Sequence, residues 1–337
     1  MISVVVPIYN EEELVVRFHE AVANSMRGVV DDWEVVYVND GSKDSSLELL
    51  KGLQSQDSHI VVVDLSRNWG HMGAISAGLL TARGDAVILM DGDFQDPPEV
   101  LPQFIEEWRK GAEVVIGVRR SRQESRKILA VLFPLFYRVL GVLSDYPIPL
   151  NAGIFGLMDR KAVDSINALR ERNRYLPGLR AWVGYSNAVV YYDRQDRLAG
   201  DGKLPFISRI KYAMDAITSF SYKPLRLSFA LFCLSACTAV LLMLAMLFTS
   251  STVAATGLGV AGAVFFVGSL LLLSVGLLGE YVGRVYDEVR GRPVSLIGEV
   301  HRAQVTLATQ AGYIAVQNGS FAVPIHIQSQ SKASRAA

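Results

Sequence analysis

The stretch Val87-Ile88-Leu89-Met90-Asp91-Gly92-Asp93 closes an apolar run with two carboxylates. An unbroken apolar run that ends in a polar turn is typical of a buried strand in a parallel sheet. In an extended backbone Asp91 and Asp93 point to the same side, and Gly92 lets the chain pass close to a ligand. Protein carboxylates bind Mg²⁺ together with substrate phosphates. The stretch therefore predicts a strand end that holds a metal ion and a diphosphate.

A lone Asp-x-Asp pair has a simpler explanation, because such pairs also occur by chance in turns and helix caps. Here the residues Gln95-Asp96-Pro97-Pro98 follow and open a helix, since proline favours the first turn. Asp96 itself also fits a turn or a cap. The position directly after an apolar strand favours the metal site over a chance match.

Similar apolar runs recur in the first 120 residues, and amphipathic stretches separate them. The runs are Val4–Val6, Val35–Val38, Ile60–Leu65, Ala86–Met90 and Val114–Gly117. The amphipathic stretches lie near Glu12–Ala23, Ser45–Leu53, Met72–Ala82 and Pro98–Lys110. Strands that alternate with helices favour a mostly parallel sheet covered on both faces. The sequence therefore predicts an α/β domain with a Rossmann-like sheet.

Polar residues follow each predicted strand at its carboxyl end, where open α/β sheets bind their ligands. In strand order they are Pro7, Tyr9 and Glu11; Asn39, Asp40 and Gly41; Ser66, Arg67 and Asn68; Asp91, Asp93 and Gln95; and Arg119, Arg120 and Arg122. Acids and arginines that meet at one edge suit a metal–diphosphate ligand. Neither a Walker A loop nor Gly-x-Gly-x-x-Gly follows the first strand, which argues against NTP hydrolysis and dinucleotide binding. The interpretation that remains is a reaction in which a diphosphate leaves with the help of a metal ion.

Two long stretches, Leu227–Thr249 and Gly257–Gly279, contain no Asp, Glu, Lys, Arg or His. Each exceeds the roughly 20 apolar residues that a helix needs to cross a bilayer, although a pair of buried core helices is the alternative. Basic residues flank the pair on both sides, whereas the connector Ser250–Thr256 is uncharged. By the positive-inside rule, the pair forms a transmembrane hairpin with both flanks in the cytoplasm.

The net charge, the first residues and the cysteines indicate where the protein is located and which partners it has. The formal net charge is zero, so no overall field attracts nucleic acid. The chain starts directly with a predicted strand and no basic signal segment, so the α/β domain and both termini are expected to be cytoplasmic, at the inner or plasma membrane. Cys233 and Cys237 lie within the first apolar stretch and form neither a disulfide framework nor a metal-ligand set. The oligomeric state stays open, a homo-oligomer included.

Three motifs at the predicted strand ends resemble family-2 glycosyltransferases of GT-A fold. They are Pro7-Ile8-Tyr9-Asn10-Glu11, Val38-Asn39-Asp40-Gly41-Ser42 and Asp91-Gly92-Asp93-Phe94-Gln95-Asp96-Pro97-Pro98-Glu99. After the second apolar stretch, Gly279-Glu280-Tyr281-Val282-Gly283-Arg284-Val285-Tyr286 narrows the resemblance to polyprenyl-phosphate glycosyltransferases. This group is related to dolichol-phosphate mannose synthase and includes bacterial undecaprenyl-phosphate glucosyltransferases. The resemblance extends from residue 2 to about residue 300.

The expected organisation follows from the resemblance and the apolar stretches together. It comprises a glycosyltransferase domain at 1–204, an interfacial amphipathic helix at 205–224, transmembrane helices at 227–249 and 257–279, and a cytoplasmic tail at 280–337. Apolar residues at helical spacing within Phe206–Ser221 support the interfacial helix. The end of the tail is expected to be disordered, because small and polar residues dominate it.

The resemblance implies transfer of a sugar from a UDP- or GDP-linked donor to the phosphate of a membrane polyprenyl phosphate, with Mg²⁺ or Mn²⁺ as cofactor. It also implies roles by position: Pro7, Tyr9, Glu11, Asp40 and Asp91 for the nucleotide sugar; Asp91, Asp93 and Gln95 for the metal; Asp91, Asp93 and Arg119 for catalysis; and Arg126, Arg197 and Lys203 for the lipid phosphate. The last three also fit ordinary solvated surface charges. We expect a single in-line displacement that inverts the anomeric carbon.

The chain departs from the family pattern at two positions. The family commonly reads Asn/Asp-x-Gly-Asp-Phe-Arg-Leu-Met where this chain has Asn151-Ala152-Gly153-Ile154-Phe155-Gly156-Leu157-Met158. Ile154 thus replaces an acid, and Gly156 replaces an arginine. A phosphate acceptor has a second pKa near 6 and is already an oxyanion at pH 7, so it does not need a general base. We therefore expect an active enzyme with altered donor or acceptor specificity.

Two alternatives remain beside the lipid-phosphate glycosyltransferase. A processive polysaccharide synthase normally carries Gln-x-x-Arg-Trp and more membrane spans, whereas this chain has only Arg180-Ala181-Trp182 and two apolar stretches. A non-catalytic membrane protein that binds nucleotide sugar or lipid is suggested by Ile154 and Gly156. The retained acids Glu11, Asp40, Asp91 and Asp93 argue against a decayed enzyme.

Overall fold

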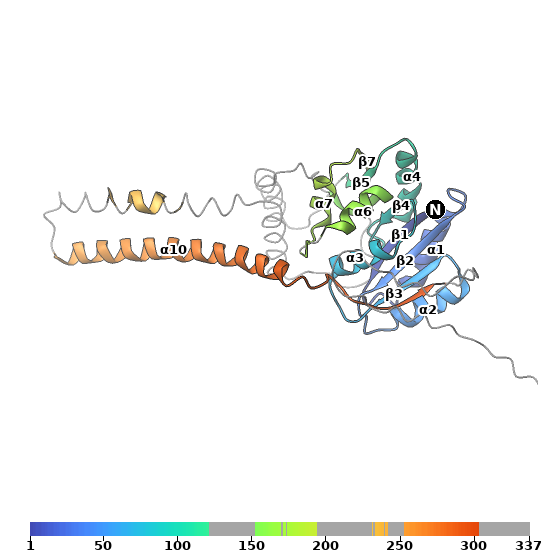
Figure 1. Cartoon of the computed structure of the whole chain (residues 1–337), viewed down its shortest axis with the longest axis horizontal. Helices are drawn as coiled ribbons and strands as arrows, with labels where there is room; N and C mark the ends of the chain where they lie inside the picture. The colour runs from blue at the N-terminus through green and yellow to red at the C-terminus, as the bar shows by residue number, and fades with distance from the viewer. Residues whose placement is uncertain are drawn as a thin grey trace, which may run out of the picture.

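The computed structural model of the chain shows an α/β domain and a long helix that extends away from it (Figure 1). The structure describes residues 1–120, 152–169, 171–172, 174–193, 231, 233–238, 240–241 and 253–302. The predicted interfacial helix at 205–224 and most of the first apolar stretch lie outside these residues. Arg126, Arg197 and Lys203 lie outside them too, so their expected roles stay predictions.

One sheet organises the α/β domain. Its strands are β1 (Ile2–Ile8), β2 (Trp33–Asn39), β3 (Ile60–Leu65), β4 (Ala86–Leu89), β5 (Val114–Arg119), β6 (Ala152–Asp159), β7 (Asn187–Tyr192) and β8 (Ile297–Arg302). Their order in the sheet is β7-β5-β6-β4-β1-β2-β3-β8. The pairs β4–β1, β1–β2, β2–β3 and β5–β7 are parallel, while β6 and β8 run antiparallel to their neighbours. The prediction of a mostly parallel sheet is confirmed.

Helices cover both faces of this sheet. They are α1 (Val15–Met26), α2 (Ser46–Gln56), α3 (His71–Thr81), the short η1 (Pro98–Val100), α4 (Leu101–Arg109), α6 (Arg160–Ala168) and α7 (Leu176–Trp182). Phe18 of α1 and Phe104 of α4 pack with Tyr37 in one apolar cluster. Ile75 of α3 and Leu179 of α7 belong to a second cluster. The alternating β-branched runs of the sequence thus form strands whose two faces are both buried, as a parallel sheet requires.

Strand β8 was not predicted, and it returns to the sheet after the long helix. It pairs antiparallel with β3, with His301 opposite Val62 and Ile297 opposite Leu65. Leu65 ends β3, so β8 enters the sheet at the edge where the parallel strands end. Residues 297–302, which the sequence suggested to be part of a tail, are therefore part of the sheet of the α/β domain.

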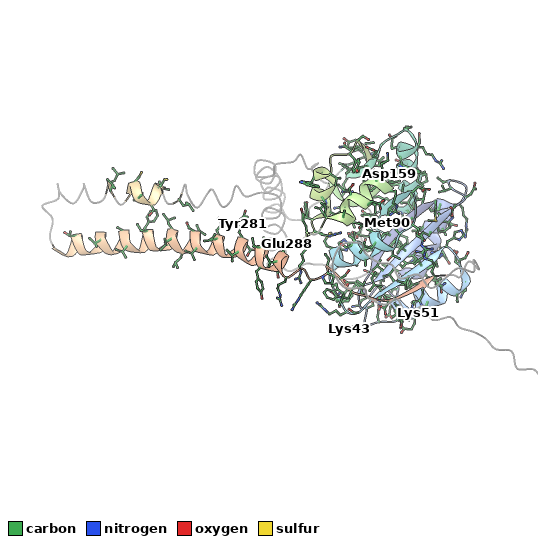
Figure 2. The ribbon with its side chains drawn as sticks, viewed as in Figure 1. Lys43, Lys51, Met90, Asp159, Tyr281 and Glu288 are labelled. Atoms are coloured by element: carbon green, nitrogen blue, oxygen red, sulfur yellow. The ribbon has the colours of Figure 1, made fainter. Side chains whose placement is uncertain are left out.

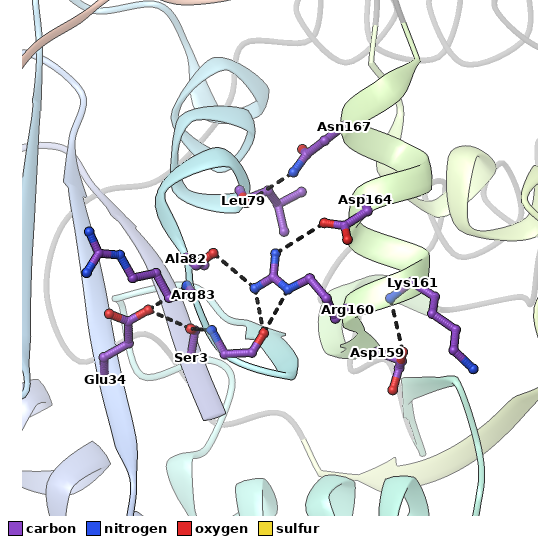
Figure 3. Close-up of polar contacts among 11 residues, drawn as sticks. Ser3, Glu34, Leu79, Ala82, Arg83, Asp159, Arg160, Lys161, Asp164 and Asn167 are labelled. Atoms are coloured by element: carbon purple, nitrogen blue, oxygen red, sulfur yellow. Dashed lines mark hydrogen bonds and ion pairs between the residues drawn. The ribbon is translucent and has the colours of Figure 1, made fainter. Parts of the chain in front are cut away.

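A buried polar network fixes β8 at the opposite edge, where the parallel strands begin. Arg302 Nη1 donates to Glu34 Oε2 at 2.8 Å, and its Nη2 donates to the carbonyl oxygen of Thr81 at 3.1 Å. Glu34 also accepts from the Ser3 hydroxyl and from the backbone N–H of Arg83, both at 2.7 Å (Figure 3). The carboxylate is thus satisfied by three elements that are distant in the sequence.

A second arginine ties α6 to the same edge (Figure 3). Arg160 donates from Nε to the carbonyl oxygen of Gly84 and from Nη2 to that of Ala82, both at 2.9 Å. Asp159 caps the helix by accepting from the N–H of Lys161 at 3.0 Å. These polar groups hold the sheet together at the edge opposite to the carboxyl strand ends.

Replacing Arg302 by alanine is expected to destabilise the protein by about 3–5 kcal/mol, because it leaves the Glu34 carboxylate buried without its cation. The side chains of Arg302 and Glu34 are only 22% and 7% exposed. Urea unfolding of the full chain measures the loss. The matched control is Lys51→Ala, which removes an ion pair to Glu299 whose side chains are 40% and 50% exposed. The control should cost under about 1 kcal/mol, and equal losses in both variants would contradict the network.

The long helix α10 (Val253–Val289) contains the second predicted apolar stretch. Among the described residues, one helical segment is long and apolar enough to cross a membrane, Gly262–Val289, with a mean hydropathy of 2.2. Figure 2 shows side chains standing out around α10, with Tyr281 and Glu288 in its carboxyl-terminal part. The two-helix hairpin and its cytoplasmic flanks stay predictions, since most of its first arm is not described.

Candidate active site

The acids after β4 lie in a turn rather than in an extended strand. β4 ends at Leu89, and Phe94 adopts a positive φ of 61°. The Asp93 carboxylate is within this turn and accepts the N–H of Gln95 at 3.1 Å. The expectation that an extended backbone aligns the two carboxylates is therefore wrong in its geometry. Turn geometry instead buries Asp93, which is 7% exposed, and leaves Asp91 partly open.

Gly92 also packs closely against the neighbouring strand β1. A β-carbon at this position would lie 2.7 Å from Cδ1 of Ile8 and 3.2 Å from Cγ1 of Val6. The residue is buried against β1, so packing also favours a residue without a side chain here, while the close approach of a ligand stays a prediction. This close packing seats the turn that carries Asp91 and Asp93 directly on the end of the neighbouring strand.

The loops after β1 and β2 bind each other reciprocally. Asn10 donates its backbone N–H to Ser42 Oγ at 3.0 Å and accepts the N–H of Lys43 at 2.8 Å. The N–H of Glu11 donates to Ser46 Oγ at 2.9 Å. Tyr9, in the loop after β1, remains 44% exposed. The predicted nucleotide-binding residues of the two motifs are thus brought together at one strand edge.

Asp40 connects the hydrogen-bonded loops after β1 and β2 to the loop after β3. Its carboxylate is 4% exposed and accepts the N–H of Trp69 at 2.6 Å. Its own N–H donates to the carbonyl oxygen of Ile8 at 2.9 Å. Burial raises the pKa of Asp40, and the hydrogen bonds from Trp69 and Gly70 oppose that rise. Asp40 therefore organises three strand ends, while direct contact with a nucleotide stays a prediction.

His71, the first residue of α3, is a site residue that the sequence analysis missed. Its Nε2 lies 3.5 Å from Oδ1 of Asp91, and the side chain is 45% exposed. Burial lowers its pKa, while Asp40, Asp93 and Asp96 oppose this, so these acids all lie within electrostatic reach of one imidazole. Its position directly after the third strand-end loop was the signal that could have identified it.

Arg119, at the end of β5, faces the same acids. Its Nε donates to the Tyr192 hydroxyl at 3.1 Å, and its Nη2 lies 3.9 Å from Oδ1 of Asp96. Burial lowers the pKa of Arg119, but Tyr192, Asp96 and Asp91 outweigh burial and raise it. The predicted catalytic arginine is therefore a fixed positive charge near Asp91.

The donor set suits a metal ion that shares its coordination with phosphate. No three His, Cys, Asp or Glu side chains converge to form a complete metal cage in the described part of the chain. Mg²⁺ usually binds one or two carboxylates and takes its remaining ligands from water and substrate phosphates. Asp91 and Asp93 match that pattern, and Gln95 follows them in the same turn. These residues could hold a divalent cation once a diphosphate is present.

The two departures from the family pattern have structural reasons in β6. Ile154 is 8% exposed and packs in an apolar cluster with Ile116 and Leu179, so an acid in its place would be buried among apolar groups. At Gly156, a β-carbon would press against the carbonyl oxygen of Val115 and lie 3.1 Å from Nη1 of Arg180. Glycine thus leaves the space that the guanidinium of α7 fills.

Arg180 supplies a positive charge close to where the family has its arginine. It is 4% exposed, and it donates to the carbonyl oxygens of Ile154, at 3.2 Å, and Gly153. Burial lowers its pKa to about 10, so it remains charged at neutral pH. A β-carbon on Gly153 would also lie 3.3 Å from Nη2 of Arg119. The start of β6 is therefore enclosed by two arginines from different elements.

The connection from α10 to β8 passes over the same edge of the sheet. Glu288 Oε1 accepts the N–H of Arg172 at 2.8 Å, which fixes the end of α10 to the segment before α7. The carbonyl oxygen of Leu296 then accepts the N–H of Ser66, the residue directly after β3, at 3.0 Å. The segment after the long apolar helix is thus attached at the end of β3, on the same carboxyl edge of the sheet that carries Asp91.

A mostly parallel sheet with acids and an arginine at its carboxyl edge has the architecture expected of a glycosyltransferase. Residues 3–166 match the family model described as Glycosyl transferase family 2. The chain is 40% identical over 299 residues to the uncharacterized glycosyltransferase YkcC of Bacillus subtilis, covering 88% of this chain and 92% of that protein. The chain belongs to glycosyl transferase family 2, and the prediction of a glycosyltransferase is confirmed.

Two further similarities were found. The chain is 37% identical over 306 residues to the SfII prophage-derived bactoprenol glucosyl transferase of Shigella flexneri, covering 89% of this chain and 98% of that protein. Among solved structures it is similar to residues 1–349 of S. aureus TarS in complex with UDP-GlcNAc. That similarity has a TM-score of 0.43 and 17% identity, and it covers 63% of this chain and 64% of that one.

Proposed function

We propose that the protein transfers a sugar from a UDP- or GDP-linked donor to the phosphate of a membrane polyprenyl phosphate, with inversion at the anomeric carbon. One observation carries this proposal: Asp91, Asp93 and Arg119 lie at the strand edge to which the segment after the long apolar helix is attached. Sequence similarity over nearly the whole length of a bactoprenol glucosyl transferase supports the lipid acceptor. The catalytic domain would then lie on the cytoplasmic side of the inner or plasma membrane.

The acids and the arginine would stabilise the departing nucleoside diphosphate. Asp91, Asp93 and Gln95 would hold Mg²⁺ or Mn²⁺, which when bound neutralises the charge that develops on the diphosphate. Arg119 adds a fixed cation on the same side, and a preorganised charge of this kind costs no reorganisation during the reaction. Pro7, Tyr9, Glu11 and Asp40 would position the nucleotide at the neighbouring strand ends.

The acceptor would attack without a general base. A phosphate monoester is largely a dianion at pH 7, so its oxygen already carries the electron pair that attacks the anomeric carbon. This fits the apolar Ile154 at the position of the family's acid. The phosphate instead needs positive charge for positioning, and Arg126, Arg197 and Lys203 are the proposed residues for this role. An altered donor or acceptor specificity remains part of the proposal.

The test is a transfer assay with the purified full chain. Undecaprenyl phosphate is supplied with UDP-glucose, UDP-GlcNAc, GDP-mannose and related donors, in Mg²⁺, Mn²⁺ or EDTA. We expect one donor to give a lipid-linked sugar in the presence of a metal, and none to react in EDTA. Nuclear magnetic resonance of the product gives its anomeric configuration. Retention of configuration would contradict the inverting mechanism. Donor binding without transfer to any polyprenyl phosphate would contradict the proposed transferase activity on this lipid.

A further inference from the structure

A buried chain of hydrogen bonds stands behind Arg119. The Tyr192 hydroxyl donates to Oδ1 of Asp96 at 2.8 Å and accepts from Nε of Arg119 at 3.1 Å. Tyr192 and Asp96 are 2% and 1% exposed, whereas the Arg119 side chain is 19% exposed. The chain thus runs from the partly open arginine at the strand edge to two fully buried groups. No sequence motif pointed to Tyr192, and the position of Asp96 in the sequence fitted a turn or a cap.

The direction of these hydrogen bonds is fixed by chemistry. A guanidinium can only donate and a carboxylate can only accept, so the single phenolic proton must go to Asp96. Burial raises the pKa of Tyr192 above the ordinary value of a tyrosine, which keeps this proton on the phenol at all physiological pH values. The hydroxyl lone pair is then left for Arg119. A charged donor and a charged acceptor at the two ends make both bonds stronger than neutral ones.

Strand β7 delivers Tyr192 to this position. Arg119 and Tyr192 are partners in the parallel pairing of β5 and β7, and the N–H of Arg120 donates to the Tyr192 carbonyl oxygen at 2.9 Å. Side chains alternate along β7, so Tyr192 points into the core while Tyr191 is 58% exposed. The Tyr192 ring also packs edge-on against Phe155 at 5.0 Å. Backbone pairing and ring packing therefore determine where the hydroxyl lies before Arg119 binds it.

We propose that Tyr192 and Asp96 are positioning residues that hold the Arg119 guanidinium beside Asp91 for sugar transfer. Neither residue touches the reacting atoms, and both act through the orientation of Arg119. With Nε engaged by the phenol, the rotation of the guanidinium is restricted, and the side chain loses less entropy when the diphosphate binds. The inference rests on the proposed role of Arg119 in catalysis.

The experiment is a double-mutant cycle in the full chain, with the most active donor of the transfer panel. Tyr192→Phe keeps the ring packing and removes only the hydroxyl. We expect it to lower kcat about tenfold to a hundredfold, the range for losing a hydrogen bond to a charged group, with a smaller change in the KM of the donor. In an Arg119→Ala background the same change should alter kcat less than about twofold, because the residue it acts through is absent. The control Tyr191→Phe, on the exposed side of β7, should leave kcat unchanged.

The outcomes separate this inference from the proposed function. Full activity of Arg119→Ala would refute the catalytic role of Arg119 and the inference with it. An equal loss from Tyr192→Phe in both backgrounds would overturn the inference alone, since a purely structural effect does not depend on Arg119. A Tyr192→Phe variant with a lower thermal midpoint but unchanged kcat would also overturn it.

Discussion

Asp93→Asn is expected to reduce sugar transfer by about 10³-fold, the largest effect on activity that the structure suggests. The amide has the shape of the carboxylate, and its oxygen can still accept the N–H of Gln95 that holds the turn. What is lost is a negative charge that is proposed, together with that of Asp91, to offset a divalent cation. Losing charge stabilisation of several kcal/mol in the transition state corresponds to this factor.

The measurement is kcat at saturating donor over a series of Mg²⁺ and Mn²⁺ concentrations. Asp32→Asn is the matched control, because this carboxylate is 76% exposed at the amino ends of the strands. The control should keep its activity, and both variants should unfold at the wild-type temperature. An Asp93→Asn enzyme with more than about a tenth of the wild-type rate would show that Asp93 is not a metal ligand of the reaction.

Gly156→Arg, which restores the family's usual residue, is expected to destabilise this chain by more than about 3 kcal/mol. Gly156 lies in the interior of the sheet, between Leu89 of β4 and Ile116 of β5. Its β-carbon would press against a backbone carbonyl oxygen, which cannot move aside as a side chain can. The added guanidinium would also compete with that of Arg180 for the same space.

Thermal unfolding measures this effect, and we expect the midpoint to fall by at least about 6 °C. Adding Arg180→Ala should not restore the stability, because the clash with the backbone of Val115 remains. The matched control is Gly52→Arg in α2, where nothing lies within 4 Å of an added β-carbon. That change should be neutral or slightly stabilising, since arginine favours a helix more than glycine does. Equal midpoints for both variants would contradict the packing described for β6.

The amino-terminal half of the fold could be predicted because its signals are local. Each of the first five strands is a short apolar run, and the polar loops after the first four lie at the same edge of the sheet. The acids Asp91 and Asp93 and the cation Arg119 could be assigned in the same way, from their positions after strands. His71 also follows a strand-end loop, but it lies just before the predicted amphipathic stretch Met72–Ala82 and was given no role.

The remainder depends on pairings between distant residues, which a single sequence does not display. The reversed direction of β6 is set by its two neighbours, and the place of β8 is set by β3 and Glu34. Gly156 looked like a missing arginine because the residue that fills its space, Arg180, comes from another element. Tyr192 is one of several tyrosines in the sequence, and only the parallel pairing of β7 with β5 brings its hydroxyl to Arg119.

The return of β8 also has a consequence for biosynthesis. Until residues 297–302 leave the ribosome, β3 would be the outer strand of the sheet, with unpaired N–H and C=O groups that can recruit another chain. The whole of α10 must be synthesised first, so this edge stays open while the apolar helix is being made. Shortened versions that end before α10 would keep every predicted catalytic acid yet expose β3, and they should aggregate more readily than the full chain.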